Sequence, residues 1–224
     1  IAPAAYARSG LTRAALRGSR YLTAQTRQER GARVVEVAKE GPSSLVYVYW
    51  ADLDRAAHEF GCSSSEWRDA ARSVNALLWQ LRRSLPPGGA LIVTADHGMV
   101  DCTDRIWLED DPLFGVGVDA IAGEPRMRHV YVDADHDPED VKNRWQLALG
   151  DRAMVLTRSE AIDTGLFGTC DPGLADRIGD VVAIAVGGWI MASRVVDERV
   201  SRLVGQHGAV TDQERRIPGL VLRG

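Results

Sequence analysis

Lysine, cysteine and long apolar runs are all scarce in this chain of 224 residues. Lys39 and Lys142 are the only lysines, and the net charge of -4 argues against a general nucleic-acid binder, because phosphate backbones select an excess of positive charge. The three cysteines, Cys62, Cys102 and Cys170, are odd in number and far apart, so we expect a reducing, cytoplasmic compartment and no disulfide framework. No run reaches the roughly 20 apolar residues of a membrane helix, and nothing resembles a signal peptide, so no membrane association is expected.

The composition that remains is that of an ordinary globular domain with one substantial core. It is 45% apolar and 26% charged, and nearly all of its 27 basic residues are arginines. This arginine bias, together with abundant Ala, Gly and Val, indicates a bacterial genome of high GC content.

The order of elements predicts an α/β fold. Residues 45–50 and 90–95 are short continuous apolar runs, typical of strands buried on both faces. Between them, apolar residues recur at helical spacing from Trp67 to Leu81. Ser63 and Glu66 form a possible capping box at the start of this helix. A strand, a helix and a strand in this order imply a right-handed crossover and a parallel pair. We therefore predict a mostly parallel central sheet with helices on both faces.

A change of amino-acid composition after the second strand predicts a small inserted αβ lobe. Gly, Pro and acidic residues become more frequent from residue 104 to residue 176. The elements expected outside the first crossover are a helix at 26–40, a strand at 128–132, a helix at 138–149, and strands at 153–157, 180–186 and 219–222. The predicted organisation is a core part at 1–103, the lobe at 104–176 and a return to the core sheet at 177–224.

Three short motifs contain a His, two of them together with an Asp, in positions that suit metal binding. Asp54 and His58 follow the first predicted strand, Asp96 and His97 follow the second, and His207 lies in a Gly-flanked turn. Ligands of open parallel sheets bind beyond the carboxyl ends of the strands, and imidazole with carboxylate is a natural donor set for zinc. Each motif has a simpler interpretation, as an i,i+4 pair on a helix, a polar turn or an exposed loop histidine. Their joint occurrence favours a metal site.

The same motifs resemble the nucleotide pyrophosphatase/phosphodiesterase family of the alkaline phosphatase superfamily. The similar segments, in matching order and spacing, are Val48–Gly61, Thr94–Met99 and Gly205–Gly208, with Ser9–Thr12 and Arg177–Asp180 in addition. The resemblance implies a hydrolase of phosphodiesters or nucleotide pyrophosphates that uses two divalent metal ions and a covalent phospho-Thr or phospho-Ser intermediate. Its substrate would be a small phosphate ester or nucleotide.

The resemblance also implies a ligand set. Asp54, His58 and His207 would hold one ion, and Asp96 and His97 would serve the second. Zinc is the first choice, with Mn and Fe as alternatives. Asp52 competes with Asp54 but lacks the i+4 spacing to His58, while His129, His136 and Cys102 match no ligand position.

The chain departs from the family pattern at the nucleophile. The family needs a further metal-binding Asp and a Thr or Ser nucleophile from its N-terminal part, yet no Asp precedes Asp52 and no apolar strand precedes Thr12. The catalytic residue is therefore unknown, and we expect it upstream of Ile1, so that the activity needs the protein's own N-terminal segment. The alternatives are a phosphomonoesterase or phosphonate hydrolase of the same superfamily, or a non-catalytic metal-binding fragment.

Overall fold

A computed structural model of the protein describes residues 1–40 and 44–224. The chain has a mixed α/β fold and divides into two compact units. Unit 1 consists of Ile1–Ala56, Ser63–Ala95 and Pro218–Gly224, and unit 2 consists of Ala57–Cys62 and Asp96–Ile217. Among the described helices, none combines the length and the apolar character of a membrane span.

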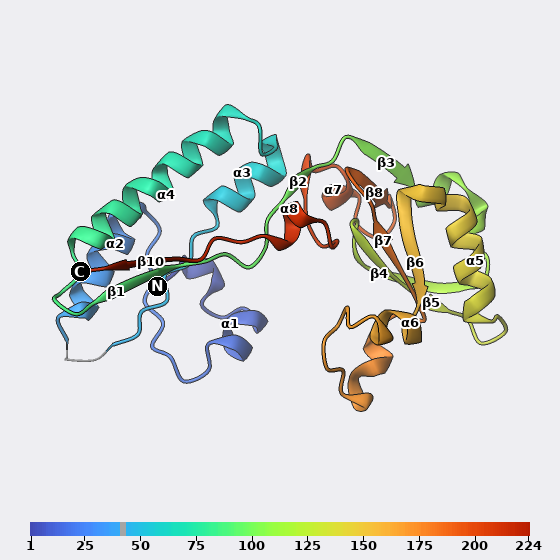
Figure 1. The fold of residues 1–224 in the computed structure, drawn as a ribbon, viewed down its shortest axis with the longest axis horizontal. Coiled ribbons are helices and arrows are strands. Elements are labelled where there is room, and N and C mark those ends of the chain that lie inside the picture. The colour runs from blue at the N-terminus through green and yellow to red at the C-terminus, as the bar shows by residue number, and fades with distance from the viewer. Residues whose placement is uncertain (41–43) are drawn as a thin grey trace. The chain divides into compact units, whose positions relative to one another are not determined.

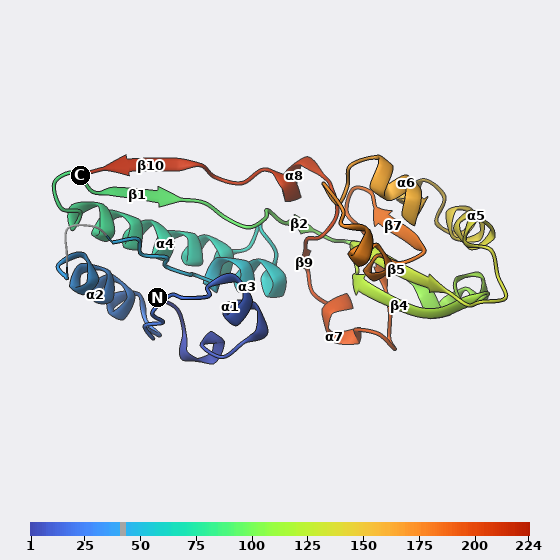
Figure 2. The same cartoon turned by 90° about the horizontal axis from the view of Figure 1, so that it is seen from below.

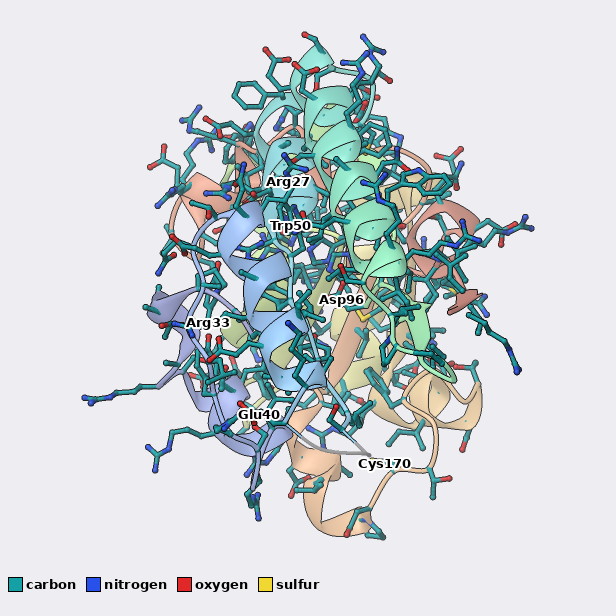
Figure 3. The ribbon with its side chains drawn as sticks, turned by 90° about the vertical axis from the view of Figure 1, so that its left-hand side faces the viewer. Arg27, Arg33, Glu40, Trp50, Asp96 and Cys170 are labelled. Carbon is teal, nitrogen blue, oxygen red and sulfur yellow. The ribbon has the colours of Figure 1, made fainter. Side chains whose placement is uncertain are left out.

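The described part of unit 1 consists of helices and a two-stranded sheet. Its elements are the 3-10 turn η1 (Ala4–Tyr6), the helices α1 (Gly10–Ala15), α2 (Arg27–Ala38) and α4 (Ser65–Arg83), the first part of α3 (Asp52–Phe60), and the strands β1 (Ala90–Val93) and β10 (Leu220–Arg223). Helix α2, which carries Arg27 and Arg33, packs against α4 (Figure 3). Strands β1 and β10 run antiparallel, side by side, with Ala90 opposite Arg223 (Figure 2).

The predicted helix starts of unit 1 are confirmed in one case and shifted in the other. The predicted helix at 26–40 forms as α2, and Thr26 and Glu29 make a complete capping box at its start. Helix α4 is capped by Ser64, whose hydroxyl accepts from the Trp67 amide, and not by Ser63. Because three serines follow one another here, the sequence does not determine which of them caps the helix, and the predicted start is off by one residue.

The strand predicted at residues 45–50 is wrong. These residues have no regular secondary structure, Leu45 is 99% exposed, and the predicted parallel pairing with 90–95 is absent from the described residues. Their backbone is tied to Ile1, whose amino group donates to the Tyr47 carbonyl and whose carbonyl accepts from the Tyr49 amide. An apolar run indicates that its side chains tend to be buried, but a strand also needs a partner backbone for its hydrogen bonds. Here the partner of β1 is β10.

Unit 2 is organised around a four-stranded sheet. Its strand order is β4–β5–β7–β6, with every neighbouring pair antiparallel. The strands are β4 (Val118–Glu124), β5 (Met127–Val132), β7 (Val181–Ala185) and β6 (Ala153–Thr157). The helix α5 (Pro138–Leu149) has the predicted bounds, and α6 (Arg158–Asp163) follows β6 directly (Figure 1).

Both faces of this sheet are covered, which explains the continuous apolar sequence of β7. Val181, Ala183 and Ala185 pack in one cluster with Val141 and Trp145 of α5. Because successive side chains of a strand point to opposite faces, the residues between them face the other way. Val182 and Ile184 belong to a second cluster, in which Ala161 of α6 is buried. A run buried on both faces is thus correctly recognised, but it lies in an antiparallel sheet.

The strand predicted at 180–186 forms as β7, which lies between β5 and β6 in the four-stranded sheet of unit 2. Burial on both faces specifies how deep a strand lies and not which sheet receives it.

The remaining elements of unit 2 are short. They are the strands β2 (Val100–Asp101), β3 (Asp104–Trp107), β8 (Trp189–Ala192) and β9 (Gly205–Gln206), the helices α7 (Glu198–Ser201) and α8 (Asp212–Arg215), and the 3-10 turns η2 (Leu108–Asp110), η3 (Pro112–Phe114), η4 (Gly150–Arg152) and η5 (Pro172–Arg177). Strands β3 and β8 are parallel, whereas β2 and β9 form an antiparallel pair. The pair β2–β9 determines where the histidine motifs lie.

Candidate metal centre

Asp54 and His58 lie on one helix. Helix α3 spans Asp52–Phe60, so residues four apart share a face, one turn from each other. The competing carboxylate of Asp52 forms an ion pair with Arg55 and is partly exposed. The i+4 spacing from which Asp54 was predicted therefore places it close to His58 on the helix.

The imidazole of His58 is held by the strand that precedes His207. Its Nδ1 lies 2.8 Å from the Gly205 carbonyl oxygen, and since a carbonyl can only accept, Nδ1 donates and Nε2 keeps its lone pair. The Val204 amide donates to the His58 carbonyl at 2.8 Å. A side chain at position 205 would overlap the carbonyl oxygen of Ala57, so this close approach requires glycine. A histidine fixed through one nitrogen is oriented to bind a metal with the other.

The pairing of β2 with β9 brings the other two histidines together. Val100 lies opposite Gln206 in an antiparallel register, so the residues before Val100 run alongside those after Gln206. The rings of His97 and His207 are stacked with centroids 3.5 Å apart, and the ring of His58 lies 5.1 Å from that of His207. Three of the five histidines of the chain thus lie together, as the metal hypothesis requires.

Three of the predicted ligands form a group that could hold one ion. Asp54, His58 and His207, all half-buried, each offer a ligand atom, and these atoms lie within 4.8 Å of one another. One carboxylate and two imidazoles are a donor set that suits zinc, and also Mn or Fe. The residues present therefore fit a divalent metal.

Asp96 and His97 are adjacent to this group but do not belong to it. The side chain of Asp96 is 77% exposed and lies 3.7 Å from Nε2 of His97 (Figure 3 labels Asp96). The ring of His97 is directed by its Nδ1, which donates to the Gly98 carbonyl at 2.9 Å. Two residues leave a zinc site short of its usual four ligands, so the second predicted site has only part of its set here.

Comparison with known proteins identifies the family. A model of the family described as type I phosphodiesterase / nucleotide pyrophosphatase matches residues 11–210. The chain belongs to this family. The family named by the three metal motifs is thereby confirmed.

Solved structures share the fold of this phosphodiesterase-family chain. Murine ectonucleotide pyrophosphatase/phosphodiesterase 5 matches with a TM-score of 0.67 and 22% identity, over 89% of this chain and 53% of that one. An inactive form of the mouse protein, in complex with AMP, matches with a TM-score of 0.67 and 21% identity over the same shares. Phosphonoacetate hydrolase from Sinorhizobium meliloti 1021, in complex with phosphonoacetate, matches with a TM-score of 0.62 and 21% identity, over 88% of this chain and 50% of that one. The chain therefore spans about half the length of the solved structures that it matches.

The two histidines and the cysteine that match no motif are engaged in local hydrogen bonds or buried in the fold. His129 lies in β5, where its Nδ1 accepts from the Gly179 amide, and burial lowers its pKa. The partly exposed ring of His136 donates to Asp133. Cys102 is buried, and this burial raises the pKa of its thiol to about 11, which disfavours the thiolate that a metal would need.

A buried ion pair that the sequence did not single out lies next to the histidine segments, since Glu214 bonds to Ala209 and Gly98. Arg126, in the turn between β4 and β5, is fully buried and forms a two-pronged ion pair with Glu214 of α8, whose side chain is 2% exposed. Thr211 and Glu214 have the spacing of a helix cap, and the Thr211 hydroxyl does bond to that carboxylate. This spacing was the only signal in the sequence, and it gave no sign of the arginine, which lies 88 positions away.

Proposed function

We propose that this chain supplies the metal-binding part of a hydrolase that cleaves phosphodiesters or nucleotide pyrophosphates. The observation that carries the proposal is the grouping of Asp54, His58 and His207 within 4.8 Å, in a chain that belongs to the type I phosphodiesterase family. The AMP bound to the inactive mouse relative supports a nucleotide-sized substrate.

The chain's own residues would bind the metal ion and orient the ligand atoms around it. His58, fixed by the Gly205 carbonyl, would present Nε2, and His207 would approach from the loop after β9. The carboxylate of Asp54 would offset part of the ion's charge and complete three protein ligands. A divalent ion held there would supply Lewis-acid stabilisation of the phosphate oxygens. Asp96 and His97 would contribute to a second ion, with further ligands from outside residues 1–224.

The nucleophile is proposed to lie in another part of the parent protein. The matching N-terminal segment contains two hydroxyl residues, but Ser9 caps the short helix α1 and the Thr12 side chain accepts a hydrogen bond from it. The coverage of about half of each matched structure supports a parent chain that contains more of the fold. The proposed division is therefore one of metal ligands here and the attacking Thr or Ser elsewhere.

The decisive experiment measures hydrolysis of three substrates by the parent protein. Zinc-loaded protein is assayed with bis(p-nitrophenyl) phosphate, p-nitrophenyl phosphate and phosphonoacetate. The expected result is preference for the diester, with a loss of several orders of magnitude in His207→Ala and no loss in His136→Ala, the matched histidine control. Preference for the monoester or for phosphonoacetate would replace the proposed substrate with that of another superfamily member. Equal turnover by both histidine variants would refute the metal centre itself.

A further inference from the structure

The carboxylate of Glu214 joins two segments that carry proposed metal ligands. Its Oε1 accepts from the Ala209 amide at 3.0 Å, two residues beyond His207. The backbone carbonyl of the same residue accepts from the Gly98 amide at 2.7 Å, one residue beyond His97. The two histidines whose rings stack are therefore each bonded, through a neighbouring amide, to one residue.

Arg126 fixes the position of that carboxylate. Its Nε and Nη2 donate to the two oxygens of Glu214 at 3.0 and 2.8 Å, and its Nη1 donates to the Trp189 carbonyl. Its own carbonyl accepts from the Ala185 amide of β7, at the centre of the sheet. A buried, fully bonded pair of this kind has one geometry, because breaking any bond leaves a buried charge unsatisfied.

We infer that the Arg126–Glu214 pair is a positioning device for the metal centre, which sets the relation of His207 to His97. This inference rests on the proposed function for its consequence in metal binding, although the ring arrangement itself can be tested without metal. Glu214 is thus a positioning residue, since it acts through the backbone next to the ligands and touches no proposed ligand atom. Partners that orient metal-binding histidines typically change affinity by about 10- to 100-fold when they are removed.

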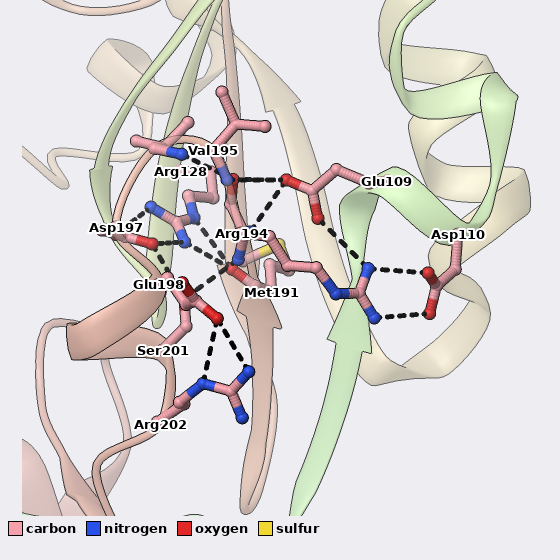
Figure 4. Close-up of polar contacts among 12 residues, drawn as sticks. Glu109, Asp110, Arg128, Met191, Arg194, Val195, Asp197, Glu198, Ser201 and Arg202 are labelled. Atoms are coloured by element: carbon pink, nitrogen blue, oxygen red, sulfur yellow. Dashed lines mark hydrogen bonds and ion pairs between the residues drawn. The ribbon is translucent and has the colours of Figure 1, made fainter.

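The chain offers a matched control in a second buried ion pair of unit 2. Arg128 is also fully buried and binds Asp197 in the same two-pronged manner, at 2.7 and 2.9 Å (Figure 4). Asp197 also accepts from the Ser201 hydroxyl. Among the described residues, the side-chain bonds of Asp197 go to Arg128 and Ser201 and reach neither 96–98 nor 207–211. Glu214→Gln and Asp197→Asn therefore remove the same kind of charge from the same unit, and only the first touches the histidine segments.

The first measurement needs no metal. With ring-labelled histidine, metal-free protein is examined by nuclear Overhauser spectroscopy, which is practical because the chain has only five histidines. We expect a His97–His207 ring contact in the wild type and in Asp197→Asn, and its loss in Glu214→Gln. Retention of the contact in Glu214→Gln would overturn the inference. If Glu214→Gln does not fold, the double variant Arg126→Met/Glu214→Gln, which removes both buried charges together, replaces it. Loss of the ring contact is again expected, and its retention would again overturn the inference.

The second measurement is zinc affinity, by competition with a chromogenic chelator, at a temperature at which each variant is folded by circular dichroism. The expected result is a loss of about 10- to 100-fold in Glu214→Gln and less than about twofold in Asp197→Asn, although both lower the melting temperature. Equal losses in the two variants would reduce Glu214 to a structural residue and overturn the inference. Equal affinity of wild type and His207→Ala would instead refute the proposed metal centre, while the ring contact still decides the positioning role.

Discussion

Gly98 provides the sharpest test of how closely the metal motif is packed. A side chain at this position would overlap the carbonyl oxygen of Gln213, and the Gly98 amide donates to the Glu214 carbonyl at 2.7 Å. In Gly98→Ala the two segments must separate. Forcing a methyl group into a packed region costs about 1–3 kcal/mol, and the lost hydrogen bond adds about 1 kcal/mol. We therefore expect the free energy of unfolding to fall by about 2–4 kcal/mol.

The assay is urea unfolding followed by circular dichroism, with Gly115→Ala as the control. Gly115 also lies in unit 2, has a φ of -96° that suits alanine, and would place its new Cβ 3.7 Å from the Pro112 carbonyl, an ordinary contact. There the loss of unfolded-state freedom predicts a change of at most about 1 kcal/mol, in the stabilising direction. With a slope of about 2 kcal/mol per M, Gly98→Ala shifts the midpoint downward by about 1–2 M. Midpoints of the two variants within about 0.3 M of each other would refute the reasoning.

Three further outcomes follow from burial and charge. Burial tends to raise the pKa of Glu214, but hydrogen bonds from Arg126 and Thr211 outweigh it and hold the pKa below its ordinary value. The stability that the ionised carboxylate contributes is present above its unfolded-state pKa and is lost as the pH falls through its folded-state pKa. On acidification, the free energy of unfolding should therefore fall more steeply in the wild type than in Glu214→Gln. Trp145→Ala removes a fully buried ring that meets Phe114 edge-on, and should cost about 3–5 kcal/mol in urea unfolding, with a loss below about 1 kcal/mol counting against the packing. Burial raises the pKa of the Cys102 thiol to about 11, so at pH 8 it should react with iodoacetamide about two orders of magnitude more slowly than free cysteine, and comparable rates by mass spectrometry would contradict this.

Local elements were largely predictable because their signals are local. The capping box of Thr26 and Glu29 and the bounds of α5, from Pro138 to Leu149, depend on residues within one or two turns. The strand 153–157 likewise has its predicted bounds. In each case the physical cause, a cap, a proline at the first turn or an apolar run, acts within the segment that forms the element.

Pairing was not predictable, because it depends on a second segment. The run at 45–50 has strand-like side chains and forms no strand, whereas β10 at the far end of the chain pairs with β1. The run of β7 was recognised, but its antiparallel neighbours β5 and β6 were not. Side-chain periodicity reports burial, and hydrogen-bond partners are chosen by the whole fold.

The candidate site divides in the same way. The sequence by itself predicted the candidate ligands and determined the i+4 relation of Asp54 to His58, because a helix brings residues four apart onto one face, and the motifs identified the family. Only the tertiary structure decided that the rings of His97 and His207 stack, since the β2–β9 register brings them together. It alone also joined Arg126 to Glu214, because a buried arginine must find its carboxylate wherever the fold brings one, at any distance along the chain.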